Sequence, residues 1–362
     1  MTRSGSKVTV VLTLAALLAG VGAAAAAVGW QRLRHLALPM LEDPSLPPAA
    51  STHPIEQGPA RALSEVARLP GRVSALLETD EAVWAGGFDT GVFRLERCEG
   101  GYLPVAALGV SGRERFINAL AEHAGHVFAA TYAGVLEIDG AGKLVRRHLK
   151  GIATEALLAS GDALLAGTVE GVFVLRDRAF ERVALTAHDG SSIRVTAMAA
   201  TGHRLWLGSP NGVHSAALEA LESAVVVRAA WHPLVFGVQA ARTNVVLALA
   251  PWGEGVLAGT DNGGVVLVDE HETRAFELDE RHANEVNPGA VAVWGDRVLF
   301  GTQGGGLIAV ETRGVGLAAS RPGGWSLPRV SAVGAAARIL VGGEDGGVFR
   351  VESPVADAVG MR

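Results

Sequence analysis

Seven stretches of the chain share one pattern of hydrophobic and polar positions. Each has an apolar triplet, a small residue, a few turn residues with glycine, and a second apolar run, as in "VWAGGFDTGVFRLE" (83–96) and "VLAGTDNGGVVLVDE" (256–270). The small residues stand at positions 86, 130, 167, 208, 259, 301 and 342, so they recur every 37 to 51 residues. A shorter apolar element precedes each stretch, usually with alanine third, as in "VSAL" (73–76). The pattern predicts at least three short strands per unit, joined by tight turns.

A repeat of about 40–50 residues with four strands per unit is typical of a β-propeller blade. The sequence therefore predicts an all-β fold, a seven-bladed β-propeller over residues 61–362. The fourth strands are the least regular, and "GYLPVAAL" (101–108) and "AFERVAL" (179–185) are candidates. Because the last unit ends soon after its third strand, we expect residues 61–69 to supply the outer strand of the seventh blade. That arrangement leaves no open edge in the ring.

The glycine turns admit two interpretations. "GTDNGG" (259–264) carries acidic and amide side chains that calcium accepts, but an EF-hand loop needs a longer run of alternating ligands that ends in glutamate. Asp, Asn and Gly are also the residues that tight hairpin turns require. We therefore expect these glycines to turn the chain and to bind no metal.

The N-terminus is strongly apolar. Residues 8–30 carry no charge and would form a helix of roughly 34 Å at about 1.5 Å per residue, enough to cross a bilayer. We expect residues 1–35 to be a membrane anchor, and the alternative is a cleaved signal peptide. Basic residues flank the run equally, so they do not orient it. Residues 36–60 are rich in proline and are expected to be a linker. The propeller is thus expected outside the cytoplasm, periplasmic or extracellular, either anchored or secreted after cleavage.

Composition narrows the function classes. The net charge of −6 argues against nucleic acid as a partner, because phosphate-backbone binders are usually basic. The single cysteine, Cys98, excludes an intramolecular disulfide, and there is no CxxC pair for zinc.

Candidate catalytic and metal-binding residues are sparse. His123 and His126 stand close in sequence, but no HExxH motif or third ligand is near them. "AHDGSS" (187–192) supplies His188, Asp189 and two serines without a G-x-S-x-G elbow. We therefore predict no catalytic residue, no metal and no cofactor. A hydrolase or lyase with its site in the central channel remains an alternative, since scattered channel loops would not reveal one by sequence adjacency.

Five arginines fall near one recurring slot, just before the first strand of a unit. Three occupy it and two lie a few residues upstream: Arg72, Arg194 and Arg329, then Arg115 and Arg242. In a propeller this slot lies at one mouth of the channel, so the arginines predict a positive, ligand-binding rim. The expected partner is a small anionic ligand or a protein with an acidic segment. The 51-residue spacing between units four and five predicts a longer surface loop around residues 231–234.

At "LWLGSPNGV" (205–213) and "GVFRLE" (91–96) the repeat resembles the two-component regulator propeller repeat. The resemblance covers all seven units, although tryptophan precedes the glycine slot only at Trp84 and Trp206, and Ala130 replaces one glycine. It implies an extracytoplasmic sensor or interaction module. No kinase, cyclase or DNA-binding segment follows the repeats. We therefore expect a non-enzymatic binding or sensor propeller tethered to the membrane through residues 8–30, with an envelope assembly scaffold as a further alternative.

Overall fold

The computed structural model describes most of the chain after residue 52. The described residues are 53–54, 56–58, 63–99, 101–106, 108, 110–223, 225–234, 244–270, 273–277, 285–313, 316–322, 327–335 and 338–351. The expected anchor or signal segment over residues 8–30 lies outside this set, and so does Arg242. Within the set, no helix is long and apolar enough to span a membrane.

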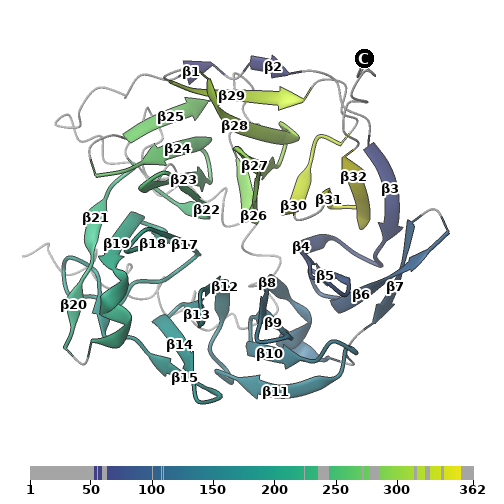
Figure 1. Cartoon of the computed structure of the whole chain (residues 1–362), viewed down its shortest axis with the longest axis horizontal. Coiled ribbons are helices and arrows are strands. Elements are labelled where there is room, and N and C mark those ends of the chain that lie inside the picture. Colours follow the sequence, from purple (N-terminus) through teal and green to yellow (C-terminus); the bar gives the residue numbers. More distant parts are fainter. Residues whose placement is uncertain are drawn as a thin grey trace, which may run out of the picture. The chain divides into compact units, whose positions relative to one another are not determined.

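Seven antiparallel sheets form the blades of a propeller (Figure 1). Blades 1 to 3 each use four consecutive strands, from the inner to the outer edge: β4 (Val73–Glu78), β5 (Val83–Gly87), β6 (Gly91–Cys98), β7 (Gly101–Ala106); β8 (Ile117–His123), β9 (His126–Thr131), β10 (Gly134–Ile138), β11 (Leu144–His148); β12 (Thr154–Ser160), β13 (Ala163–Thr168), β14 (Gly171–Arg176), β15 (Ala179–Arg182). Blades 4 to 6 continue with β17 (Ala197–Thr201), β18 (Arg204–Ser209), β19 (Gly212–Ala217), β21 (Ala230–His232); β22 (Val246–Trp252), β23 (Gly255–Thr260), β24 (Val265–Val268), β25 (Thr273–Glu277); β26 (Val286–Trp294), β27 (Arg297–Thr302), β28 (Leu307–Arg313), β29 (Gly316–Pro322). Blade 7 takes β30 (Val330–Ala335), β31 (Ile339–Gly343) and β32 (Gly347–Val351) from the C-terminal end and β3 (Leu63–Arg68) from the N-terminal end.

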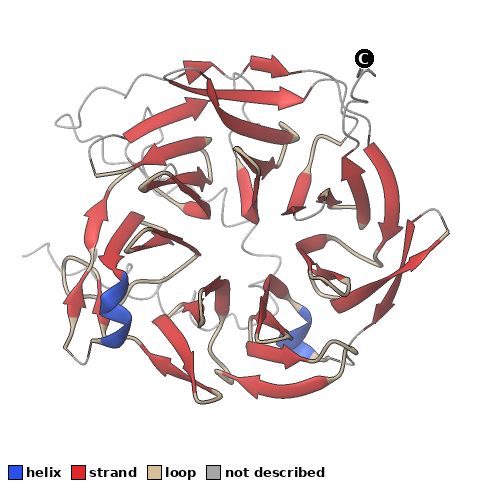
Figure 2. Cartoon of the chain, in the orientation of Figure 1, coloured by secondary structure: helices blue, strands red, loops and turns tan. Residues whose placement is uncertain are grey.

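The remaining elements are short (Figure 2). β16 (Leu185–Thr186) pairs with β20 (Val227–Arg228), and the described helices are two 3₁₀ turns, η1 (Gly112–Arg115) and η2 (Leu218–Glu222). Both predicted fourth strands are confirmed, as β7 and β15.

The predicted ring closure is confirmed. β3 pairs antiparallel with β32, with Leu63 opposite Val351 and Arg68 opposite Gly347. The inner strand β30 also contacts β4, so the last blade adjoins the first. A blade built from both ends of the chain leaves β32 with a partner on each side.

Part of the segment expected to be a linker is instead paired to the blades. β1 (His53–Pro54) lies parallel to β25 of blade 5, and β2 (Glu56–Gly58) lies parallel to β29 of blade 6. An outer strand otherwise presents unpaired N–H and C=O groups, and an extended chain satisfies them at little cost. The boundary between linker and propeller therefore falls before residue 53, earlier than the sequence predicts.

In six of the seven turn motifs the first glycine packs between blades, which corrects the expectation that it turns the chain. A Cβ on Gly259 would lie 2.6 Å from Cγ1 of Val286, the residue that opens the inner strand of the next blade. Gly342 of blade 7 meets Val73 of blade 1 in the same way, at 2.5 Å. The later Gly264 does turn the chain, with a φ of +69° that favours glycine. One motif thus uses its glycines for two different physical reasons.

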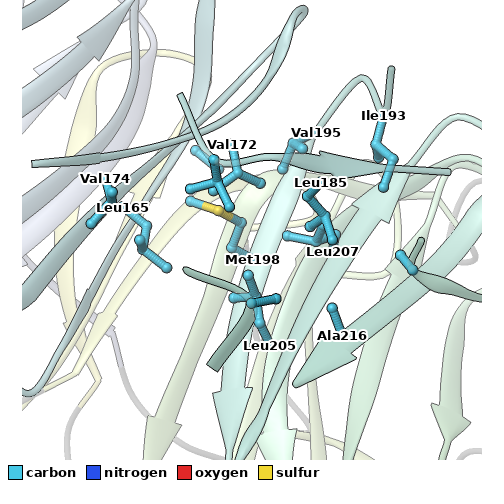
Figure 3. Packing of buried hydrophobic residues seen from close by; sticks show 14 of the residues in the cluster. Leu165, Val172, Val174, Leu185, Ile193, Val195, Met198, Leu205, Leu207 and Ala216 are labelled. Atoms are coloured by element: carbon cyan, nitrogen blue, oxygen red, sulfur yellow. The ribbon is translucent and has the colours of Figure 1, made fainter. Parts of the chain in front are cut away.

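The hydrophobic core is divided among the blade interfaces. Seven clusters of buried residues are present in the described part of the chain, and each lies between two neighbouring blades. Between blades 3 and 4, for example, Leu165 and Val174 pack near Met198, Leu205 and Leu207 (Figure 3). Each buried side chain of this size contributes about 1.5–3 kcal/mol, so every blade is held by both of its neighbours.

Most inner strands carry an irregularity near their start, and most have a polar residue there. The pairing register shifts in six of the seven inner strands, for example between Val73 and Ala75. We call the residue after the opening residue the collar position; across the seven blades it is Ser74, Asn118, Glu155, Thr196, Leu247, Asn287 and Ser331. In four blades this side chain donates to the main-chain carbonyl that opens the next inner strand: Asn118 to Thr154 (2.7 Å), Thr196 to Val246 (2.6 Å), Asn287 to Val330 (2.7 Å) and Ser331 to Val73 (2.7 Å). The collar therefore links neighbouring blades by hydrogen bonds.

Candidate functional site

One face of the ring gathers two kinds of segment, and we call it the mouth face. Because strands in a blade alternate in direction, the start of the inner strand and the turn between the second and third strands lie at the same end. Backbone hydrogen bonds join the two segments, from Phe88 N to Arg72 O and from Asp261 N to Val245 O, both at 2.9 Å. The arginine slot therefore lies beside the turn between the second and third strands. The sequence pattern did not indicate that the side chains of this turn belong to the candidate site.

Three aromatic rings lie together on the mouth face of blades 1 and 2. Phe88 comes from the turn after β5, Phe116 from the residue before β8, and Tyr132 from the turn after β9. The ring centroids are 5.3 Å apart for Phe88 and Phe116, 5.6 Å for Phe116 and Tyr132, and 6.2 Å for Phe88 and Tyr132. Distances of this size are favourable for edge-to-face and tilted pairs. All three rings are half-buried, so each keeps an accessible part.

Charged groups surround these rings. The Arg72 guanidinium carbon lies 5.3 Å from the centroid of Phe88. Arg194, from the slot before β17, donates to Glu155 Oε1 from Nη2 at 2.6 Å and from Nε at 3.2 Å. We call Arg72, Phe88, Phe116, Tyr132, Glu155 and Arg194 the mouth group.

The ionisation of Tyr132 reflects this surrounding. Burial raises the pKa of the Tyr132 phenol, and the Glu155 carboxylate raises it further. The positive charges of Arg72 and Arg194 act on the pKa in the opposite direction, and so does that of Arg113. Charges of both signs thus act on one phenol, and the phenol stays protonated at neutral pH.

The other arginines of the expected rim are placed differently. Arg115 donates from Nε to the main-chain oxygen of Asp89 at 2.6 Å, and Arg329 pairs with Glu344 at 3.0 Å on blade 7. Arg194 and Arg329 therefore have carboxylate partners, Glu155 and Glu344. The rim carries both signs of charge, and its role in ligand binding stays a prediction.

A bulge in blade 6 reaches across the central axis at the same end. The inner strand β26 begins at Val286, four residues before the "AVAV" element that the repeat pattern indicates, and its pairing skips from Val286 to Val291. A Cβ on Gly289 would lie 3.5 Å from the main-chain oxygen of Asn118 in blade 2.

The histidines near the turn of blade 2 form a bridge. His126 Nδ1 lies 2.7 Å from Glu137 Oε1, and His148 Nε2 lies 2.8 Å from Glu137 Oε2. Burial opposes ionisation of Glu137, but the hydrogen bonds from His148 and His126 lower its pKa. Among the described residues, no group of three or more His, Cys, Asp or Glu side chains is arranged to hold a metal ion. We therefore interpret the bridge as a tie between strands.

Two segments that are distant in sequence meet at blades 3 and 4. His188 of "AHDGSS" stacks on Trp231 of β21, with 4.6 Å between ring centroids and 6° between ring planes. Asp189 accepts from the Ser191 hydroxyl at 2.6 Å, which is local turn chemistry. The loop expected around residues 231–234 is instead partly the outer strand of blade 4, because Ala230–His232 pairs with β19.

A buried serine–histidine pair in blade 4 has a structural role. Ser209 Oγ lies 3.1 Å from His214 Nε2, which by itself resembles a nucleophile and its base. The same hydroxyl position caps the turn in four other blades, where Thr131, Thr168, Thr260 and Thr302 donate to the main-chain oxygen of a glycine just as Ser209 does. Because the hydroxyl recurs without a histidine, it serves the turn.

Comparisons with known proteins establish the fold. No protein-family model matches the chain, and no curated protein matches its sequence. Among solved structures, the extracellular domain of the putative hybrid two component system BT4673 from B. thetaiotaomicron has TM-score 0.62 and 16% identity, over 81% of this chain and 40% of that one. The WD40 β-propeller domain of Doa1 has TM-score 0.58 and 13% identity, over 81% and 97%. YCF48 bound to D1 peptide has TM-score 0.58 and 10% identity, over 84% and 99%.

The likeness to two-component proteins is limited in extent. This chain spans 40% of the length of the BT4673 domain, and the identities are low throughout. The comparisons therefore support an all-β, seven-bladed propeller that resembles extracellular domains of putative two-component systems.

Proposed function

We propose that this protein is an extracytoplasmic, membrane-tethered binding propeller that captures a small carboxylate-bearing ligand on the mouth group. The observation that carries the proposal is the Arg72 guanidinium over the Phe88 ring, which lies together with Phe116 and Tyr132. The positive charge of Arg194 also acts on the Tyr132 phenol. Guanidinium groups recognise carboxylates by charge-assisted hydrogen bonds, and aromatic rings bind the apolar part of the same ligand. The likeness to extracellular domains of putative two-component systems supports a sensor-like role.

The tether and the location belong to the same proposal. Residues 8–30 are long and apolar enough to anchor the chain, and a binding module outside the cytoplasm samples ligands there. An enzymatic role has less support, because the serine–histidine pair and the histidine bridge both have structural explanations.

Thermal unfolding of the full chain tests the proposal. A panel of small carboxylic acids, from acetate to aromatic carboxylates, is added at millimolar concentration. We expect at least one apolar carboxylate to raise the unfolding temperature, and Arg72→Ala and Arg194→Ala to lose that rise. Arg147→Ala is the matched control, because Arg147 lies on β11, the outer strand of blade 2, and pairs there with Glu114 of η1. A panel without any stabilising carboxylate, or stabilisation that survives both substitutions, would falsify the proposal.

A further inference from the structure

The collar position of blade 3 breaks the pattern of its neighbours. Four blades place a neutral donor there, which bonds the next blade's carbonyl, and blade 3 places Glu155. An ionised carboxylate cannot donate a hydrogen bond. The link to blade 4 is made instead by Arg194, whose Nη2 and Nε both donate to Oε1. Blade 3 thus carries a carboxylate at its collar position, and this carboxylate acts on the Tyr132 phenol.

The second oxygen of the Glu155 carboxylate, Oε2, differs from the first in its hydrogen bonding. Arg194 Nε and Nη2 both donate to Oε1, and Oε2 accepts no hydrogen bond from the described residues. The Glu155 side chain is 17% exposed, so it keeps some access to solvent.

The mouth group therefore combines positive arginine side chains, one carboxylate and three aromatic rings. Arg72 lies over Phe88, and the charges of the Arg194–Glu155 pair act on the Tyr132 phenol. A bare carboxylate held by Arg194 would bring a second negative charge beside Glu155, and like charges at such distances repel. A ligand with an ammonium next to its carboxylate relieves this repulsion, because the ammonium can face Oε2 and the Tyr132 ring.

We infer that the ligand class is a small zwitterion with an apolar side chain, a free α-amino acid. Its carboxylate binds the arginines, its ammonium binds Glu155, and its side chain packs on Phe88 and Phe116. This inference rests on the proposed function and narrows it: Glu155 is the residue that separates amino acids from plain carboxylic acids.

Calorimetric titration of the full chain tests the inference with three probes of one skeleton. L-phenylalanine carries both charges, 3-phenylpropanoate lacks the ammonium, and phenethylamine lacks the carboxylate. We expect L-phenylalanine to bind at least tenfold more tightly than either of the others. We expect Glu155→Gln to abolish this preference, with weaker binding of L-phenylalanine and equal or stronger binding of 3-phenylpropanoate.

Two further variants guard against a merely structural effect. Glu155→Ser installs the collar residue of blades 1 and 7 and should give the same loss of preference. Glu344→Gln removes the carboxylate of the equivalent arginine pair on blade 7, away from the aromatic rings, and should leave all three affinities unchanged. Equal binding of 3-phenylpropanoate and L-phenylalanine to the parent chain overturns the zwitterion inference and leaves the carboxylate proposal standing. Binding of none of the three probes also overturns the inference, and the carboxylic acid panel then decides the proposed function separately.

Discussion

The Ser331 hydroxyl donates a 2.7 Å hydrogen bond to the main-chain oxygen of Val73, 258 residues away in the chain. This bond joins the seventh blade to the first at the collar, in the same way that Asn118 joins blade 2 to blade 3. Ring closure thus depends on hydrogen bonds between inner strands as well as on β3, the outer strand of blade 7.

Removal of this bond should weaken the closed ring. Ser331→Ala deletes a fully buried donor, and we expect the free energy of unfolding to fall by about 1–2 kcal/mol. Urea denaturation measures the change. Ser111→Ala is the control, because Ser111 is exposed and makes no capping bond. Equal stability of the two variants would show that the collar bond has no net effect.

The glycine at the blade interface should not tolerate a methyl group. Gly259→Ala places a Cβ 2.6 Å from Val286 and 3.0 Å from Phe300, and overpacking of this kind costs about 1–3 kcal/mol. A double-mutant cycle with Val286→Ala checks the cause. We expect the double variant to lose less unfolding free energy than the two single variants together, by at least about 0.5 kcal/mol. If the losses of the two single variants simply add, the strain in Gly259→Ala does not come from Val286.

Acid should weaken the chain through His214. Burial lowers the pKa of this imidazole from 6.5 to about 4, and the positive charges of His188 and His232 act in the same direction. The unfolded chain binds the proton between these two values and the folded chain does not, so stability falls as the pH drops from 6.5 toward 4. At pH 5 the loss is about 2 kcal/mol relative to neutral pH.

The variant His214→Leu removes this contribution. The corresponding residue of blade 2 is Leu136, so leucine suits the position. We expect the difference in unfolding free energy between pH 7 and pH 5, measured by urea denaturation, to shrink by about 2 kcal/mol in the variant. An unchanged difference would mean that another group causes the acid sensitivity.

The N-terminal strands should differ in importance. A chain that begins at residue 63 loses β1 and β2 but keeps β3, and we expect it to unfold cooperatively as a monomer. A chain that begins at residue 70 also loses Val66 and Leu69 from the core between blades 7 and 1, and it exposes the edge of β32. We expect that chain to aggregate. Size-exclusion chromatography and thermal unfolding of the two chains would separate these outcomes, and equal behaviour would contradict the closure.

The architecture was readable from the sequence because it repeats. Strand periodicity, turn glycines and the small residue at each interface are local requirements that every blade must meet, and seven copies in phase make them visible. The missing fourth strand of the last unit likewise predicted the closure by residues 61–69. The prediction that Gly259 turns the chain is wrong. A glycine is required there because Val286 of the next blade approaches it closely, and a local sequence pattern does not contain that contact.

Only the tertiary structure decided the candidate site. The arginine slot was visible in the sequence, but Phe88, Phe116 and Tyr132 come from different segments and blades and meet only when the ring forms. Glu155 has meaning only beside Arg194, 39 residues away, and beside the neutral collar residues of other blades. Repetition encodes what all blades share, whereas a binding site arises where single blades depart from the repeat, and contacts between such departures are set by the closed ring.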